Sequence, residues 1–295
     1  MHPDLAAFAI SKTAIGLSTL TVDWYTSFVR RYSEWASKIN APTEKPETVE
    51  GYLAYLRTGG YSAKTISGCY RSLSVFFNWM GERRGLKPSP MDVIPRPTAP
   101  IKRVAHITAG QFQRLYNSVP GHRWWEERDR AILLMLFYSG LRASELLALR
   151  VSSVDRERMI LLVTEGKGGK DRDVPCTGET VIQLDRYLEI LPPYPSDALF
   201  IGRDKGSFSP RGPFLYDGLK EMLRRRCKAA GMAHYSAHKF RHGYAMTFAN
   251  AGMPLSALAA SMGHSSVSVT ERFYARWQTA NLSAVYNEAL QKIGN

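Results

Sequence analysis

The chain has 295 residues, of which 44% are hydrophobic, and it carries a formal net charge of +13. This length and apolar content allow two domains or one large one, and they exclude a chain that is disordered throughout. The charge and a pI near 9.7 indicate a polyanionic partner, of which nucleic acid is the commonest; a solvated basic surface without such a partner is the alternative.

The cysteine pattern and the N-terminus bear on the cellular compartment. Cys69, Cys176 and Cys227 are too far apart in the sequence for a disulfide framework or a zinc motif, and they fit a reducing cytoplasm. The N-terminal residues MHPDLAAFAI lack the basic region and long apolar core of a secretory signal. The most apolar run, residues 131–138, is far too short to cross a bilayer. We therefore expect a cytoplasmic protein with no membrane partner.

Helical periodicity dominates the first part of the chain. Aromatic residues recur every three or four positions after Thr21, as in the buried stripe of an amphipathic helix: Trp24, Phe28, Tyr32 and Trp35. Two further helical segments follow, ETVEGYLAYLR and SAKTISGCYRSLSVFFNWMGERR, the second with Ser62 as its N-cap. Together with a weaker helix over 3–11, they predict a small all-α domain over residues 1–88.

A proline-rich segment separates this domain from the rest. Residues 87–103 hold five prolines, and such a stretch cannot continue a helix. We predict an extended linker over 89–105. A second domain then covers residues 106–295.

The second domain is predicted to be mostly helical with one β-hairpin. Thr108 caps a helix through about Val119, and the turn SGLR leads from a helix at 126–138 into the helix ASELLALR. Strand-like runs at 159–164 and 172–176 flank the glycine-rich segment EGKGGKD, which is typical of a hairpin. The remaining predicted helices are about 178–190, 212–230, 236–250, 254–262, 268–277 and 281–293. The fold class is therefore mainly α, with a short hairpin or small sheet.

The segment HKFRHGYAM at 238–246 raises a question of chemistry. His238 and His242 have the i, i+4 spacing of a zinc clip, but Lys239 stands where a metalloprotease has its glutamate base, and no third ligand is found nearby. We therefore expect no metal. A phosphate site fits better, because Arg241 offers a planar fork of donors and His238 can donate to the same group or accept a proton. A buttressing role at the edge of the core remains open for His242.

Three other stretches carry residues that could complete a phosphate site. Arg142 follows a Ser-Gly turn at the start of a helix, and Glu145, one turn later, can orient it. Lys167 lies at the tip of the predicted hairpin, where it could donate a proton. His264 directly follows Gly263, which ends a helix, and Tyr274 lies on the next predicted helix.

These motifs occur in an order that resembles the tyrosine recombinases, or phage integrase family. The order is R-x-x-E after a Gly-Leu turn, a lysine in a Gly-Lys-Gly hairpin, H-x-x-R-H, and Gly-His followed by a tyrosine. The resemblance is dense over residues 138–277, and the two-domain layout is similar to that of Xer-type members. Relatives with these motifs include recombinases of phages, transposons, integrons and chromosomes. The resemblance implies a core-DNA-binding domain over 1–88 and a catalytic domain over 106–295.

The resemblance also implies a catalytic role for each residue. Tyr274 is the nucleophile that becomes joined to a 3′ phosphate, and Arg142 and Arg241 stabilise the charge on the nonbridging oxygens. Lys167 protonates the leaving 5′ oxygen, and His238 assists as a base or donor. The remaining expected site residues are His264, which hydrogen-bonds the phosphate, and Glu145, which supports the first arginine. No metal or other cofactor is implied, because arginines supply the positive charge.

Two expectations concern the C-terminal region. Tyr274 follows His264 by ten residues, one more than in many relatives, and a tyrosine that packs its own helix is the alternative reading. The segment 281–293 has an apolar stripe that can pack on its own domain. In the family, such a helix docks on a neighbouring protomer and links a tetramer, so we expect protomer exchange here.

The predicted function is site-specific DNA recombination through a 3′-phosphotyrosine intermediate and a Holliday junction. A type IB topoisomerase and a non-catalytic DNA-binding protein are the alternatives. We expect double-stranded DNA as the partner, with an accessory directionality factor possible and with association with the nucleoid. The residues assigned to DNA binding are Lys64, Arg71, Lys170 and Arg172.

Overall fold

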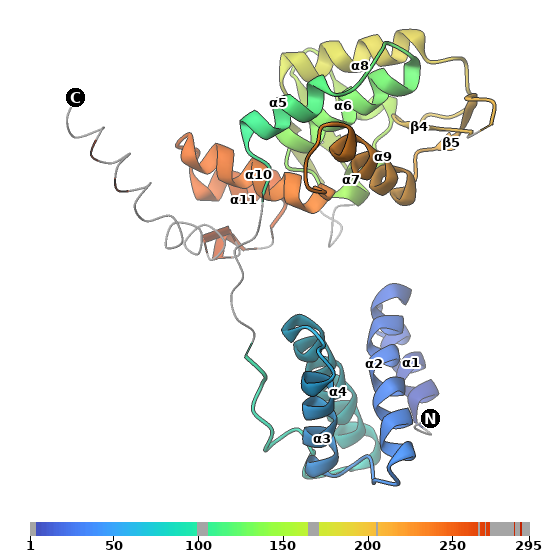
Figure 1. Ribbon diagram of the computed structural model, residues 1–295, viewed down its shortest axis with the longest axis vertical. Helices are drawn as coiled ribbons and strands as arrows, with labels where there is room; N and C mark the ends of the chain where they lie inside the picture. The colour runs from blue at the N-terminus through green and yellow to red at the C-terminus, as the bar shows by residue number, and fades with distance from the viewer. Residues whose placement is uncertain are drawn as a thin grey trace. The chain divides into compact units, whose positions relative to one another are not determined.

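The structure is a computed structural model of the chain, and it describes residues 4–98, 106–164, 171–204, 206–264, 266–268, 270, 271, 286 and 290. The chain divides into two compact units, Met1–Lys102 and Arg103–Asn295, both drawn in Figure 1. This division falls within the predicted linker 89–105. Helices form most of both units, and the second unit also holds two small antiparallel sheets. The predicted mainly α fold class is therefore confirmed.

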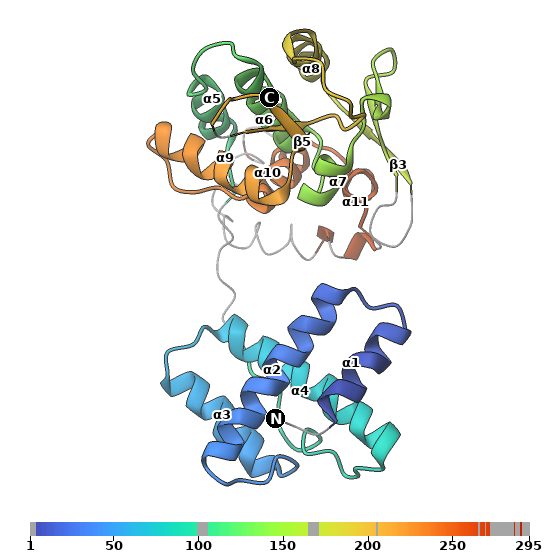
Figure 2. The ribbon, with the colours of Figure 1, turned by 90° about the vertical axis from the view of Figure 1, so that its right-hand side faces the viewer.

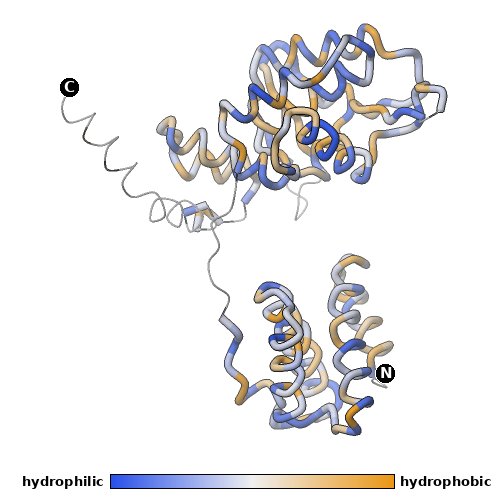
Figure 3. Tube along the Cα trace, in the orientation of Figure 1, coloured by the Kyte–Doolittle hydropathy of each residue, from blue (hydrophilic) through white to orange (hydrophobic). Residues whose placement is uncertain are grey.

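The first unit is a bundle of four helices in its described residues. They are α1 (Leu5–Ala14), α2 (Thr19–Lys38), α3 (Pro46–Thr58) and α4 (Ala63–Arg84). The hydroxyl of Ser62 accepts a hydrogen bond from the backbone N–H of Thr65 at 3.1 Å, which confirms the predicted N-cap. Pro46 begins α3, at a position where the missing N–H leaves no hydrogen bond unmade. In Figure 3, hydrophobic residues recur along each helix between hydrophilic ones, as amphipathic packing requires.

The aromatic stripe predicted for α2 is only partly in the core. Tyr32 is 1% exposed, but Trp24, Phe28 and Trp35 are half-buried. The fully buried hydrophobic residues of α2 are Val22, Val29, Tyr32 and Ala36. At 3.6 residues per turn, the buried face is rotated around the helix relative to the aromatic stripe, with Tyr32 shared by both. Trp24 instead packs along the seam with α4, where a Cβ on Gly68 would lie 3.1 Å from its ring.

The first part of the predicted linker belongs to the first unit. Met91 and Ile94 are 7% and 5% exposed and form part of that unit's hydrophobic core. The hydroxyl of Tyr70 on α4 donates to the carbonyl of Ile94 at 2.9 Å. Prolines prevent a helix here, but they do not prevent apolar side chains from docking on the bundle, so the connection between the units begins later than residue 89.

In the second unit, α6 is the central helix. The other helices of this unit in the described residues are α5 (Ala109–Asn117), α7 (Ala143–Ala148), α8 (Gly178–Ile190), α9 (Tyr216–Ala229), α10 (Ala237–Asn250) and α11 (Leu255–Met262). α6 itself spans Trp124–Tyr138, and it is buried on all sides, even at Glu127, Arg128 and Asp129. Figures 1 and 2 both show it between α5, α8 and α9. Burial all round explains why residues 131–138 form the most apolar run of the sequence.

The predicted hairpin is present and belongs to a three-stranded sheet. β2 (Ile160–Val163) pairs antiparallel with β3 (Arg172–Pro175), with Val163 opposite Arg172. β1 (Val154–Asp155) pairs with the other edge of β2. β1 was not predicted, because two residues are too short to show a period.

A second sheet was not predicted. β4 (Ile201–Arg203) pairs antiparallel with β5 (Pro210–Pro213). The helix predicted over 212–230 begins only at Tyr216. β5 contains two prolines and a glycine and has no apolar alternation, so its strand form depends on pairing with β4 rather than on its own residues.

The structure describes only some residues of the two helices predicted at the C-terminus. Residues 267, 268, 270, 271, 286 and 290 are helical, and the rest of the helices predicted over 268–277 and 281–293 lies outside the described residues. No helix in the described part of the chain is long and apolar enough to cross a membrane.

Candidate active site

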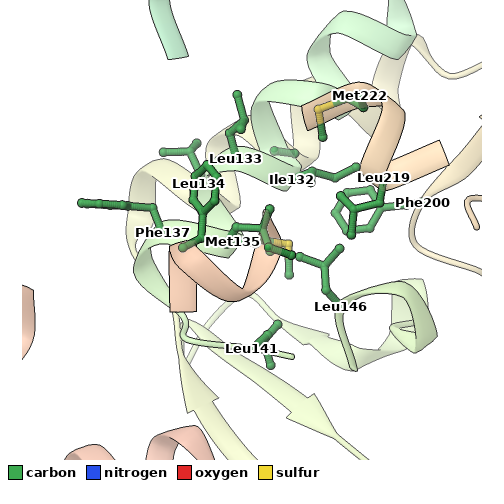
Figure 4. Close-up of a cluster of buried hydrophobic side chains, with 14 of the residues drawn as sticks. Ile132, Leu133, Leu134, Met135, Phe137, Leu141, Leu146, Phe200, Leu219 and Met222 are labelled. Carbon is green, nitrogen blue, oxygen red and sulfur yellow. The ribbon is translucent and has the colours of Figure 1, made fainter. Parts of the chain in front are cut away.

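The backbone around Gly140 fixes the position of Arg142. Gly140 has a φ of +62°, and a Cβ there would lie 2.4 Å from the ring of Tyr244, so only glycine fits this turn. Arg142 is the N-cap of α7, and its backbone N–H donates to the carboxylate of Glu145 at 2.7 Å. Leu141 and Leu146, on either side, are fully buried. Figure 4 shows these two leucines at the edge of the hydrophobic cluster beneath α6.

Glu145 holds two arginine side chains. Its carboxylate accepts from Arg142 Nη1 at 2.5 Å and from both terminal nitrogens of Arg172, at 3.0 and 2.8 Å. The Glu145 side chain is 5% exposed, and that of Arg172 is 12% exposed. Burial raises the pKa of the Glu145 carboxyl, but the hydrogen bonds from Arg172 and Arg142 outweigh burial and hold this pKa at about 2. Glu145 is therefore ionised at neutral pH.

The C-terminal end of α11 receives three arginines. A helix end carries partial negative charge on its unpaired carbonyls, which favours cations there. Gly263 ends the helix in the left-handed conformation, with a φ of +62°, as the sequence predicts. The three contacts are Arg172 Nε to Ser261 O at 2.9 Å, Arg241 Nη2 to Met262 O at 2.5 Å and Arg142 Nη2 to Gly263 O at 2.7 Å.

Arg241 is the most buried of these three arginines. It is 6% exposed, and its Nη1 also donates to the carbonyl of Gly140 at 2.6 Å. Its Nη1 lies 4.0 Å from Glu145 Oε2. Burial, followed by repulsion from Arg142, lowers the pKa of Arg241 to about 10, so the guanidinium stays charged at neutral pH. Together, Arg142, Arg172, Arg241 and Glu145 form what we call the arginine–glutamate cluster.

The histidines lie beside this cluster in two different settings. His238 is exposed and His242 half-buried on α10, and their Nε2 atoms are 2.9 Å apart. Burial and the neighbouring His238 lower the pKa of His242 to about 4. His264 Nδ1 lies 2.7 Å from the hydroxyl of Thr270, and burial and Arg241 lower its pKa to about 4. His242 and His264 are therefore neutral at pH 7.

His238 and His242 have the spacing of a zinc clip, and the described residues around them can be compared with such a site. Among them, no group of three or more histidines, cysteines or carboxylates is arranged to hold a metal ion. His238 and His242 lie against each other, with ring centroids 4.2 Å apart and planes at 73°. This contact supports the buttressing role that the sequence left open for His242.

The structure brings together five of the seven predicted catalytic residues. Arg142, Glu145 and Arg241 belong to the arginine–glutamate cluster. His264 lies close enough to Arg241 for the arginine's charge to lower the pKa of His264. His238 lies beside His242 and lowers the pKa of His242. Lys167 and Tyr274 lie outside the described residues, as does Lys170.

Arg172 has a setting that the sequence analysis did not foresee. It was assigned to DNA binding, but its donors are directed at Glu145 and at the end of α11. A signal for this was present in the alternation of β3, where Arg172 lies on the same face as the buried Val174. Lys64 and Arg71, by contrast, are exposed on α4, with the Arg71 guanidinium 4.6 Å above the ring of Trp24.

Comparison with known proteins covers both units. Residues 106–280 match the Phage integrase family, and residues 5–85 match the Phage integrase, N-terminal SAM-like domain. Tyrosine recombinase XerA of Thermococcus kodakarensis is 32% identical over 262 residues, which are 87% of this chain and 84% of that protein. Tyrosine recombinase XerD of Ralstonia nicotianae is 28% identical over 264 residues, covering 87% and 83%.

A solved structure shares the fold. It is the XerH site-specific recombinase bound to a palindromic difH substrate, in a post-cleavage complex. The likeness has a TM-score of 0.74 at 20% identity and covers 93% of this chain and 81% of the other.

Proposed function

The chain belongs to the phage integrase family of tyrosine recombinases, and on this premise we propose that it is a site-specific recombinase of double-stranded DNA. The observation that carries the proposal is the arginine–glutamate cluster. Two arginines from distant parts of the chain, Arg142 and Arg241, are held beside one ionised carboxylate and one helix end. Such a fixed pair of guanidinium groups suits a phosphodiester whose negative charge grows during reaction.

Strand cleavage is a transesterification. The hydroxyl oxygen of Tyr274 forms a bond to phosphorus, and the bond from phosphorus to the 5′ oxygen breaks. The 5′ oxygen takes a proton from Lys167, and His238 acts as the base that accepts the proton lost by the Tyr274 hydroxyl. Arg142 and Arg241 stabilise the nonbridging oxygens in the transition state, without a requirement for a metal ion. The energy of the broken ester is retained in the 3′-phosphotyrosine, so the 5′ hydroxyl of another strand can rejoin the DNA.

The remaining residues support this arrangement. Glu145 keeps Arg142 in one orientation, because the Glu145 carboxylate accepts hydrogen bonds from both the backbone N–H and the side chain of Arg142. His264 is neutral at pH 7 and can donate one hydrogen bond to the phosphate. Arg172, which the sequence assigns to DNA binding, is in our proposal a positioning residue for Glu145.

Recombination requires more than one protomer. We propose that a tetramer assembles on two DNA core sites, exchanges strands in two steps through a Holliday junction, and uses segment 281–293 to connect neighbouring protomers. An accessory directionality factor and association with the nucleoid belong to the same proposal. The two alternatives from the sequence, a type IB topoisomerase and a non-catalytic DNA-binding protein, are not favoured by relatives named as tyrosine recombinases.

A trapping assay tests the chemistry. The protein is incubated with nicked duplexes from the flanks of its own gene, and products are separated on denaturing gels. We expect an adduct on the 3′ phosphate with the wild type and with Tyr216→Phe, an exposed tyrosine on α9, but none with Tyr274→Phe, which should still bind DNA. An adduct formed by Tyr274→Phe would refute the assignment of the nucleophile. DNA binding without any adduct would favour the non-catalytic reading.

A second experiment tests the assembly. Sedimentation of the protein with DNA should give four protomers on two sites, and Holliday junctions should accumulate with nicked or mismatched core DNA. A chain ending at residue 280 should cleave DNA but fail to form the tetramer. Relaxation of supercoiled DNA by a monomer, without junctions, would instead favour the topoisomerase.

A further inference from the structure

A second group of arginines surrounds one buried carboxylate, away from the arginine–glutamate cluster. Asp129 of α6 is 0% exposed and accepts hydrogen bonds from Arg128, Arg225 and Arg226 at distances of 2.7–3.3 Å. Arg203 of β4 lies close enough for Arg225 and Arg128 to repel its charge. One carboxylate cannot neutralise four guanidinium groups, so this region has excess positive charge.

Several N–H donors of this group have no acceptor among the described residues. Arg128 Nε, Arg203 Nη1 and Arg225 Nε are buried and lack a hydrogen-bond partner within the part of the chain that the structure describes. Arg128 is itself only 2% exposed. A buried donor without a partner is unfavourable, and in native proteins it calls for an explanation, such as a ligand that the site binds.

These side chains line an open cavity of about 850 Å³, which we call the α9 pocket. Its cationic lining residues are Arg128, Arg203, Arg211, Lys220, Arg224 and Arg225. Among the described residues, the acidic ones that line it are Asp217 and Glu221, and Glu221 forms an ion pair with Arg224 at 2.7 Å. The surplus of positive charge therefore faces the cavity.

Aromatic rings keep two of the guanidinium groups in place. The guanidinium carbon of Arg128 lies 4.1 Å from the centre of the Phe214 ring. That of Arg203 lies 4.8 Å from Phe208 and 5.2 Å from Trp125. Stacking of this kind fixes the plane of a guanidinium, and among the described residues it leaves Arg128 Nε and Arg203 Nη1 without an acceptor of their own. Burial, followed by repulsion from Arg225 and Arg128, lowers the pKa of Arg203, and a bound anion would relieve this repulsion.

We propose that the α9 pocket binds a backbone phosphate of duplex DNA, as a contact separate from the scissile phosphate at the arginine–glutamate cluster. This inference rests on the proposed function. Arginines in a fixed plane are well suited to phosphate oxygens. The pocket is open and larger than one phosphate requires, which fits an anion that arrives on a polymer. α9 also packs beside α7, the helix that begins after Arg142, in both Figure 1 and Figure 2.

The salt dependence of DNA binding tests the proposal directly. The logarithm of the binding constant falls linearly with the logarithm of salt concentration, with a slope of about −0.9 for each phosphate contact. We expect Arg203→Gln and Arg225→Gln each to make this slope less negative by about one, measured by fluorescence anisotropy on an intact duplex. The matched control is Arg156→Gln, which removes the same charge from a surface ion pair with Asp185 and should leave the slope unchanged.

The folding of each variant is checked by circular dichroism and thermal unfolding. Arg225 is 41% exposed, so Arg225→Gln should fold even if Arg203→Gln does not. Slopes equal to that of the wild type in a folded pocket variant would overturn the proposal. If Arg156→Gln changed the salt slope by the same amount as the pocket variants, the proposal would also be overturned, because the effect would then come from net charge.

A second arm separates DNA from a free phosphate ion. Thermal unfolding is measured in inorganic phosphate and in chloride at equal ionic strength. Stabilisation by phosphate that the pocket variants lose, combined with an unchanged DNA slope, would mean that the pocket binds a free anion and would overturn the DNA assignment. The covalent adduct of the trapping assay is scored separately, so a failure of the proposed chemistry can be distinguished from a failure of the pocket.

Discussion

Arg172 and Arg142 donate hydrogen bonds to the same carboxylate, that of Glu145. Arg172 begins β3, the second strand of the hairpin, whereas Arg142 is the N-cap of α7. Both arginines also donate to the end of α11. One carboxylate and one helix end therefore hold Arg172 and Arg142 in fixed positions relative to each other.

Replacement of Arg172 should slow cleavage without weakening DNA binding. We expect Arg172→Ala to reduce the single-turnover cleavage rate at saturating DNA by about 100-fold, because a small displacement of Arg142 is costly in the transition state. Arg172→Lys should recover little, since an ammonium cannot form the paired contact with Glu145. A weaker dissociation constant with a reduced salt slope would instead support the DNA-contact role inferred from the sequence.

Removal of the charge on Glu145 should destabilise the second unit. In Glu145→Gln, the guanidinium groups of Arg142, Arg172 and Arg241 lose their common anion, and we expect a loss of about 3 kcal/mol in the free energy of unfolding, as for other broken buried pairs. Urea denaturation measures this change. The control is Glu157→Gln, at an exposed position, which should unfold like the wild type.

A methyl group at Gly140 should be poorly tolerated. Gly140→Ala combines a left-handed backbone, which costs about 1–2 kcal/mol, with a clash against the Tyr244 ring, for which overpacking costs about 1–3 kcal/mol. Gly252→Ala is the matched control, because Gly252 has a φ of +91° but nothing within 4 Å of its added Cβ. If the two variants lose equal stability, the clash with the Tyr244 ring adds nothing to the cost of the left-handed backbone.

Stability should fall in two steps as the pH is lowered. The pKa values of His242 and His264 are depressed to about 4 in the folded protein, so the unfolded chain binds more protons between pH 6.5 and 4. Their contribution is complete above pH 6.5 and is lost as the pH falls toward 4. Glu145, with a pKa of about 2, gives a further loss between about pH 4.5 and 2.

Urea denaturation at a series of pH values tests this order. Glutamine cannot be protonated in this range, so the free energy of unfolding of His264→Gln should change less with pH between pH 6.5 and 4. If the free energy of unfolding of His264→Gln changed with pH as steeply as that of the wild type, His264 would not titrate with a depressed pKa.

DNA contacts of the first unit can be measured independently. Lys64 and Arg71 are exposed on α4. We expect Lys64→Gln and Arg71→Gln each to weaken binding to all DNA sequences and to make the salt slope less negative by about one. Lys45→Gln, before α3, is the control. An unchanged slope for Arg71→Gln would indicate that its stacking on Trp24 is structural.

The sequence by itself determined the features that depend on neighbours along the chain. The caps at Ser62 and Thr108, the helix end at Gly263 and the β2–β3 hairpin each follow from a few consecutive residues, and the structure contains all of them. The ordered motifs also led to the family, because the order of chemical groups along the chain needs no knowledge of distances. The mainly helical class follows from periodicity in the same way.

Only the tertiary structure decided which groups meet. β5 became a strand because β4 lies beside it, and Met91 and Ile94 joined the first unit because its helices offered them an apolar surface. Arg172, which the sequence assigns to DNA binding, lies against Glu145, and three arginines donate to Asp129. The physical reason is the same in each case: a hydrogen bond or an ion pair depends on separations in space, and residues far apart in the chain reach those separations only when the whole core has packed.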